Sequence, residues 1–199
     1  MAEDNKINYL EWIRENIKYI FIGISMGILL VISYKYYEYE TDKQSLKASE
    51  LYYKLVLYSN DDDEIKNISN QIINNYSKSI YYPLTLFYLA KISHDKYDYK
   101  SAEEYLNEVI NEDYNETYTT LAKIRLSRVY LSLNNYSKSL DILEDINEDS
   151  SFSEIVYELK GDIYKYKNNK NKALEFYEKA LDSSVINKEL LLMKKNDSE

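Results

Sequence analysis

The chain has 199 residues, a formal net charge of −9 and no cysteine. The lack of cysteine excludes disulfides, zinc fingers, iron–sulfur clusters and cysteine nucleophiles, and the acidic charge argues against nucleic acid, whose phosphates an acidic domain repels. Three glycines and one proline are too few for a turn-rich β-fold. The composition therefore indicates an all-α protein.

The first segment, residues 1–18, is polar, and within it Tyr9, Ile13 and Ile17 share one helical face. Trp12 is suited to the level of the lipid headgroups. We expect an amphipathic leader that lies in the membrane interface and continues into the next segment. The alternative is a leader without stable structure.

A transmembrane helix is predicted over residues 19–35. Residues 19–34 carry no charge and lie between Lys18 and Lys35. They span about 24 Å as a helix, somewhat less than the hydrocarbon core, but both lysines can extend to the headgroups. A cleaved signal peptide would have a shorter leader and small residues at its exit. A buried core helix is the remaining alternative.

Two features of this helix concern its partners and direction. Gly23 and Gly27 form the G-x-x-x-G spacing that lets another helix approach closely, so they are a candidate transmembrane contact, with a second copy or another membrane protein. The spacing also arises by chance.

The orientation of a membrane helix follows the Lys/Arg bias of its flanks. Here the count of basic residues is equal on the two sides, with Lys6, Arg14 and Lys18 before the helix and Lys35, Lys43 and Lys47 after it.

Residues 36–199 are predicted to form a helical repeat domain that begins with a hairpin over 44–80. Leu46, Leu51, Leu55 and Val56 would form the apolar face of its first helix, and Ile65, Ile68, Ile72 and Ile73 that of its second. Between them, the run Asn60 to Asp63 is expected to end the first helix and cap the second. Two helices joined by so short a turn form an αα-hairpin.

Three further hairpins are indicated by a recurring pattern of small residues, over about 83–116, 120–153 and 154–187. Ala90, Ser127 and Gly161 lie 37 and 34 residues apart, and each is followed twelve residues later by another small residue, Ala102, Ser139 and Ala173. Large residues follow four positions further on, at Leu106, Leu143 and Tyr177. This is the tetratricopeptide-repeat pattern. The tail from Asn187 has room for one more short helix.

Repeat solenoids present a groove lined by the first helix of each hairpin. By that geometry the candidate protein-binding residues are Phe87, Lys91 and His94 in the first repeat, Ile124, Arg128 and Leu131 in the second, and Glu158, Asp162 and Lys165 in the third. The alternative for each is packing against a neighbouring helix. Catalysis is not expected, because His94 is the only histidine and no nucleophile or phosphate-binding motif occurs. Nor do we expect a cofactor, a metal or a small-molecule substrate.

The layout resembles the YfgM-like ancillary subunits of the bacterial SecYEG translocon. The matching stretches are Glu15-Asn16-Ile17-Lys18, Tyr34-Lys35-Tyr36, Leu121 to Leu133 and Leu159-Lys160-Gly161-Asp162. The resemblance implies a single-pass inner-membrane protein with a cytoplasmic N-terminus and periplasmic repeats. It also implies partners, namely the translocon, a membrane-anchored periplasmic chaperone and secreted chains.

Three hypotheses follow. The first is a non-enzymatic, membrane-anchored scaffold that assists secretion at the translocon. The second keeps the fold but turns the repeats toward the cytoplasm, as an adaptor for another protein complex. The third is a self-association module acting through Gly23 and Gly27.

Overall fold

The computed structural model describes residues 9–57, 61–147, 150–183 and 187–198. Within these ranges every regular element is a helix, so the all-α prediction is confirmed. The helices are α1 Tyr9–Leu57, α2 Asp62–Asn75, α3 Tyr81–Asp95, α4 Tyr99–Glu112, α5 Glu116–Ser132, α6 Tyr136–Glu144, α7 Ser153–Tyr166, α8 Lys170–Ser183 and α9 Lys188–Asn196.

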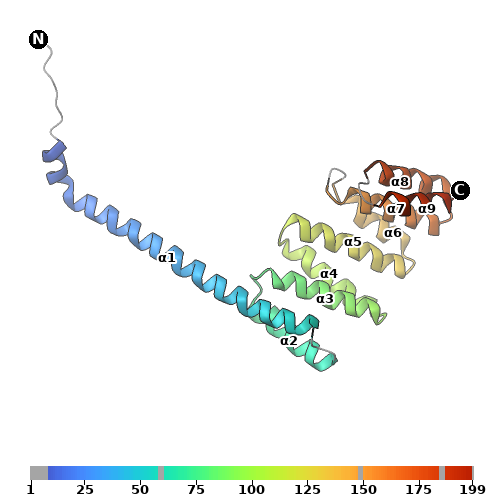
Figure 1. Cartoon of the computed structure of the whole chain (residues 1–199), viewed down its shortest axis with the longest axis horizontal. Coiled ribbons are helices and arrows are strands. Elements are labelled where there is room, and N and C mark those ends of the chain that lie inside the picture. Colours follow the sequence, from blue (N-terminus) through green and yellow to red (C-terminus); the bar gives the residue numbers. More distant parts are fainter. Residues whose placement is uncertain (1–8, 58–60, 148–149, 184–186, 199) are drawn as a thin grey trace, which may run out of the picture.

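The long helix α1 extends away from the rest of the molecule, and α2 to α9 stack side by side next to its C-terminal end (Figure 1). Its 49 residues span about 74 Å. Within Trp12–Leu57 an 18-residue window has a mean hydropathy of 1.9, and none of its residues is buried against the described part of the chain. By length and composition α1 can therefore cross a membrane.

One uninterrupted helix joins three segments that the sequence suggests separately. The leader from Tyr9, the apolar stretch and the first helix of the hairpin all belong to α1. Residues 1–8 of the predicted leader lie outside the described residues. Before Ala48 the described side chains of α1 are exposed or partly exposed, and Ala48 is the first to be fully buried. The part of α1 between Lys35 and Ala48 is a helical stalk, about 20 Å long, and one side of it lines a pocket together with Tyr76, Lys78 and Ser79.

The last turns of α1 pack against α2. Leu55, Ile68 and Ile72 form the buried core of this hairpin, and Leu51 and Ile65 pack against it. The expected face is wrong at Leu46 and Val56, which are 62% and 37% exposed. The buried side of this helix runs instead through Ala48, Leu51 and Leu55, which follow one another at helical spacing.

The acidic turn between α1 and α2 differs in detail from the predicted cap. Asp61 occupies the N-cap position of α2, but its side chain accepts no capping hydrogen bond. Asp62, Asp63 and Glu64 lie in the first turn, where the helix dipole favours carboxylates. Asp62 also forms an ion pair with Lys96 at the end of α3.

Three equivalent turns confirm the repeat pattern at the level of the backbone. Each joins the two helices of one hairpin through a residue with positive φ, at Tyr97, Asn134 and Asn168. The following residue donates its N–H to a carbonyl five positions back, as Asp98 does to Ser93 at 2.8 Å. This is a Schellman ending. The side chains of Asp98, Asn135 and Asn169 then accept from the N–H three residues later, so one residue ends one helix and caps the next.

The small residues of the pattern lie where the two helices of a hairpin touch. In the second repeat, Ser127 and Ser139 are both fully buried and each hydroxyl donates to the other's carbonyl, at 2.9 and 2.7 Å. In the third repeat, Gly161 lies directly against the ring of Tyr177. The predicted small-to-large register is therefore the register of helix packing.

Tyrosine hydroxyls add hydrogen bonds between helices. Tyr82 donates to Glu108 at 2.6 Å and Tyr130 donates to Glu103 at 2.7 Å, both on α4. Burial, together with the hydrogen bond to Glu103, raises the pKa of Tyr130 to about 12. The neutral phenol is thus the form that the fold stabilises.

Tyr97 is the exception among the three turns, because its two counterparts are asparagines. A tyrosine in the left-handed region pays a steric cost that asparagine and glycine largely avoid. We expect Tyr97→Asn to raise the free energy of unfolding by about 0.5–1 kcal/mol, measured as a higher urea midpoint. A lower midpoint would mean that the edge-on contact of Tyr97 with Tyr99 outweighs the backbone strain.

Candidate binding groove between the first two repeats

A hollow of about 270 Å³ lies between α3 and α5, the first helices of two successive hairpins. Its floor is apolar and consists of Ala90, Leu106 and Val129, which also belong to the largest core cluster. Its rim is basic, formed by Lys91, His94, Arg125 and Arg128. In a chain of net charge −9, this is a local concentration of positive charge.

The helical register explains why these residues meet. Lys91 and His94 are three residues apart on α3, and Arg125 and Arg128 are three apart on α5, so each pair shares a helix face. Ala90 is small enough to leave space over the floor. The structure therefore brings together Lys91, His94 and Arg128, three of the residues predicted from sequence.

Arg125 was not among the predicted residues, although it defines one side of the hollow. Its guanidinium lies 4.6 Å from the centre of the Phe87 ring, a cation–π contact that holds the side chain in place. Burial lowers the pKa of Arg125, and the nearby charge of Arg128 lowers it further. The three-residue spacing from Arg128 is the sequence signal that could have identified it.

His94 and Lys91 already have polar contacts within the chain. Nε2 of His94 lies 3.1 Å from the hydroxyl oxygen of Ser132, so α3 and α5 are linked at this end of the hollow. Lys91 donates to Asp95 at 2.7 Å, one turn further along α3. Both side chains are exposed enough to exchange these partners for a ligand.

The remaining predicted residues of the first two repeats point elsewhere. Phe87 is 4% exposed in the first core cluster, where its ring also contacts Tyr118. Ile124 is 1% exposed in the second cluster, and Leu131 packs against that cluster. These three side chains therefore support the helices that carry the groove and are not free to line it.

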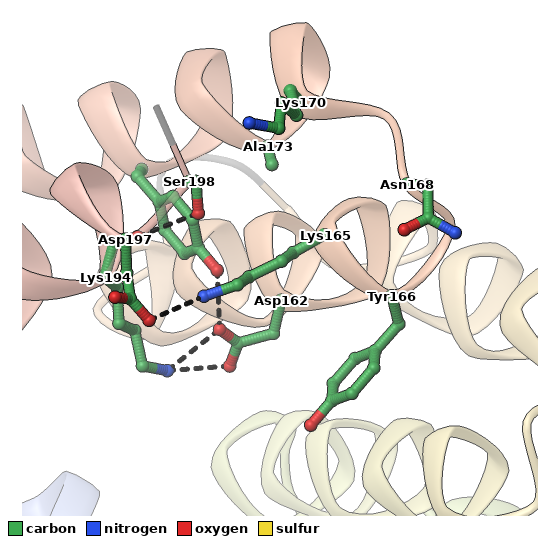
Figure 2. A pocket seen from close by; sticks show the side chains of 10 residues that line it. Asp162, Lys165, Tyr166, Asn168, Lys170, Ala173, Lys194, Asp197 and Ser198 are labelled. Atoms are coloured by element: carbon green, nitrogen blue, oxygen red, sulfur yellow. Dashed lines mark hydrogen bonds and ion pairs between the residues drawn. The ribbon is translucent and has the colours of Figure 1, made fainter.

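In the third repeat the predicted groove residues contact the C-terminal helix α9. Lys194 of α9 donates to Glu158 at 2.6 Å and to Asp162 at 2.7 Å, and Lys165 donates to Asp197 at 3.2 Å. Figure 2 shows Lys194, Asp162, Lys165 and Asp197 pointing toward one another beside a second pocket of about 660 Å³. The helix α9 therefore covers this end of the solenoid.

Gly23 and Gly27 lie on the exposed apolar part of α1, and among the described residues no atom from outside the adjoining helix backbone lies within 4 Å of a Cβ built at either position. Both are therefore open to a neighbouring helix. Their contact with such a helix stays a prediction. Within the described ranges no group of three His, Cys, Asp or Glu side chains is arranged to hold a metal ion.

The fold defines a class of protein: a tetratricopeptide-type helical solenoid, carried on a long apolar helix, with a basic-rimmed hollow between α3 and α5. The chain belongs to the tetratricopeptide repeat-like domain family, whose sequence profile matches residues 10–198. The match includes the apolar helix as well as the repeats.

The curated relatives of the chain share one name. This chain is 28% identical over 200 residues to the ancillary SecYEG translocon subunit of Haemophilus influenzae, and the alignment covers 99% of this chain and 98% of that protein. The protein of the same name from Buchnera aphidicola (subspecies Acyrthosiphon pisum) is 28% identical over 92% of this chain and 95% of its own. The protein of the same name from Neisseria gonorrhoeae is 25% identical, and the alignment covers 89% of this chain and 87% of that protein. No solved structure is significantly similar.

Proposed function

We propose that the chain is a non-enzymatic adaptor, anchored in the bacterial inner membrane by α1, whose repeats bind protein partners at the SecYEG translocon. The observation that carries the proposal is the combination of full-length similarity to proteins named ancillary SecYEG translocon subunits with an exposed apolar helix that can cross a membrane. The groove between α3 and α5 supplies a surface for a polypeptide partner.

The finer part of the proposal concerns direction and partners. We propose a cytoplasmic N-terminus and periplasmic repeats, with a membrane-anchored periplasmic chaperone and secreted chains as further partners that the repeats bring to the channel. The stalk supports such a role, because an uninterrupted helix from the apolar stretch to Ala48 fixes both the height and the rotation of the repeats relative to the membrane.

Site-specific photo-crosslinking in intact cells tests the proposal. A crosslinker at Lys91 or Arg128, on the rim of the groove, is expected to trap translocon or chaperone chains. A crosslinker at Lys100, an exposed residue at the start of α4, is the matched control and should give far fewer products. If the rim positions trap neither kind of chain under active secretion, the proposal is wrong.

Protease access separates this proposal from the reverse orientation, in which cytoplasmic repeats would assemble another complex. The charges on the two sides of the apolar stretch are tied, so they favour neither direction. In spheroplasts, externally added protease should degrade residues 40–199 if the repeats are periplasmic. Protection of that segment until the membrane is lysed would support the cytoplasmic adaptor.

A further inference from the structure

The two arginines of the repeat domain are both on the rim of one hollow. The chain contains three arginines, and the third, Arg14, lies near the start of α1. In the described part of the chain, neither Arg125 nor Arg128 has a carboxylate oxygen within 4.0 Å. The one lysine on each of the two helices that flank the hollow does have one: Lys91 on α3 pairs with Asp95, and Lys123 on α5 pairs with Asp145.

The two arginines place like charges three residues apart on one face of α5, and the side chain of Arg128 is exposed to solvent. Arg125 is half-buried, and both burial and the charge of Arg128 lower its pKa. Carboxylates are abundant on the surface, since Asp and Glu number 34 against 25 Lys and Arg, yet none neutralises this pair. A bound anion would relieve the repulsion between the two guanidinium groups and form charge-assisted hydrogen bonds with them.

The rest of the hollow indicates what carries the anion. Its floor of Ala90, Leu106 and Val129 is apolar, so it favours an aliphatic group next to the charge. Its volume of about 270 Å³ lies just below the range of small-molecule sites, roughly 300–1,000 Å³, and suits one or two side chains of a longer ligand. Figure 1 shows α3 and α5 near the C-terminal part of α1, with the N-terminal part of α1 extending away from them, which disfavours a lipid headgroup as the source of the anion.

We propose that the hollow between α3 and α5 binds an acidic segment of a partner polypeptide, whose Asp or Glu carboxylate is held by Arg125 and Arg128 while a neighbouring aliphatic side chain rests on Ala90, Leu106 and Val129. The inference rests on the proposed role as an adaptor for protein partners. It adds the chemical class of the segment and the atoms that recognise it. Lys91 and His94, on the opposite wall, restrict the segment to a path along the rim.

Peptide binding to the full-length chain in a neutral detergent tests this inference. The probe is a fluorescent synthetic peptide in which Glu alternates with Leu and both ends are blocked, and binding is followed by fluorescence anisotropy. We expect saturable binding that weakens with added NaCl. Arg128→Gln should weaken binding about tenfold, and Arg128→Lys should restore only part of it, because lysine cannot form the bidentate contact.

Two controls make the test specific. Lys100→Gln removes the same charge from the exposed start of α4 and should leave the affinity unchanged. A peptide with Gln in place of each Glu should bind about tenfold more weakly or not at all. Equal binding of the two peptides, or equal affinity of the wild type and Arg128→Gln, overturns the inference. In that case, crosslinks from the rim to translocon chains would still support the proposed adaptor role, so the two failures can be told apart.

Discussion

Gly161→Ala is expected to lower the free energy of unfolding of the repeat domain by about 2 kcal/mol. A Cβ at this position would lie 2.6 Å from Cε1 and 2.7 Å from Cδ1 of Tyr177. The ring cannot move aside easily, because Tyr177 is fully buried and its hydroxyl donates to Asp162 at 2.8 Å. Alanine would gain roughly 1 kcal/mol in helix propensity, which offsets only part of this clash. Urea unfolding followed by circular dichroism measures the change.

A compensating substitution shows whether the clash is the cause. The first repeat has Ala90 and Leu106 at the positions of Gly161 and Tyr177. Gly161→Ala combined with Tyr177→Leu should therefore cost less than the sum of the two single changes, with a coupling energy of about 1–2 kcal/mol. Additive effects would contradict the explanation from packing.

The chain also supplies a matched glycine control. Gly23 is helical, as Gly161 is, but in the described part of the chain no neighbouring side chain or element lies within 4 Å of a Cβ added there. Gly23→Ala should leave the unfolding of the repeats unchanged. A comparable loss at Gly23 would mean that the effect of Gly161→Ala is not local.

The repeats could be predicted from sequence because their determinants are short-range. Small residues such as Ser127 and Ser139 must lie twelve positions apart to meet across a tight hairpin, and that spacing is visible in the sequence. The continuity of α1 could also have been predicted. No glycine or proline occurs between Gly27 and Pro83, so neither residue type interrupts the helix between the apolar stretch and the acidic turn at Asp61 to Asp63.

The groove could be predicted only in part, because its outline depends on contacts between helices. The repeat register placed Lys91, His94 and Arg128 correctly on the rim. It could not show that Tyr118 and Arg125 cover Phe87, since those contacts come from α5, the first helix of the next hairpin. For the same reason, the sequence predicted a short helix after Asn187 but not what it would cover.

That C-terminal helix leads to the second large expected effect: Lys194→Gln should lower the free energy of unfolding by about 2 kcal/mol. Lys194, Glu158 and Asp162 have side chains that are 27%, 20% and 25% exposed, so removing the lysine leaves two half-buried carboxylates without their cation. Hydrogen exchange should then increase across α7 and α9. Lys188→Gln, at the exposed start of the same helix, is the control and should change stability by less than about 0.5 kcal/mol.

The difference in the free energy of unfolding between the wild type and Lys194→Gln should depend on pH, and this dependence identifies the charge of Lys194 as its source. Burial alone would lower the pKa of Lys194, but the hydrogen bonds to Asp162 and Glu158 outweigh it, and the pKa is raised above 10.5. Folding therefore favours the protonated form of Lys194. The contribution of this charge to the free energy of unfolding is complete below pH 10.5, and it is lost as the pH rises through the higher pKa that Lys194 has in the folded state. The gap in stability between the wild type and Lys194→Gln should be constant up to about pH 10 and narrow above it.

Tyr177 provides an internal reference for that experiment. Burial and the hydrogen bond to Asp162 raise its pKa as well, so both proteins should lose stability above pH 10 as the phenol of the unfolded chain ionises. Only the difference between them reports on Lys194. A gap that stays constant through the alkaline range would mean that the aliphatic part of Lys194, rather than its charge, holds α9 against α7. In that case Lys194→Met would preserve most of the stability that Lys194→Gln loses.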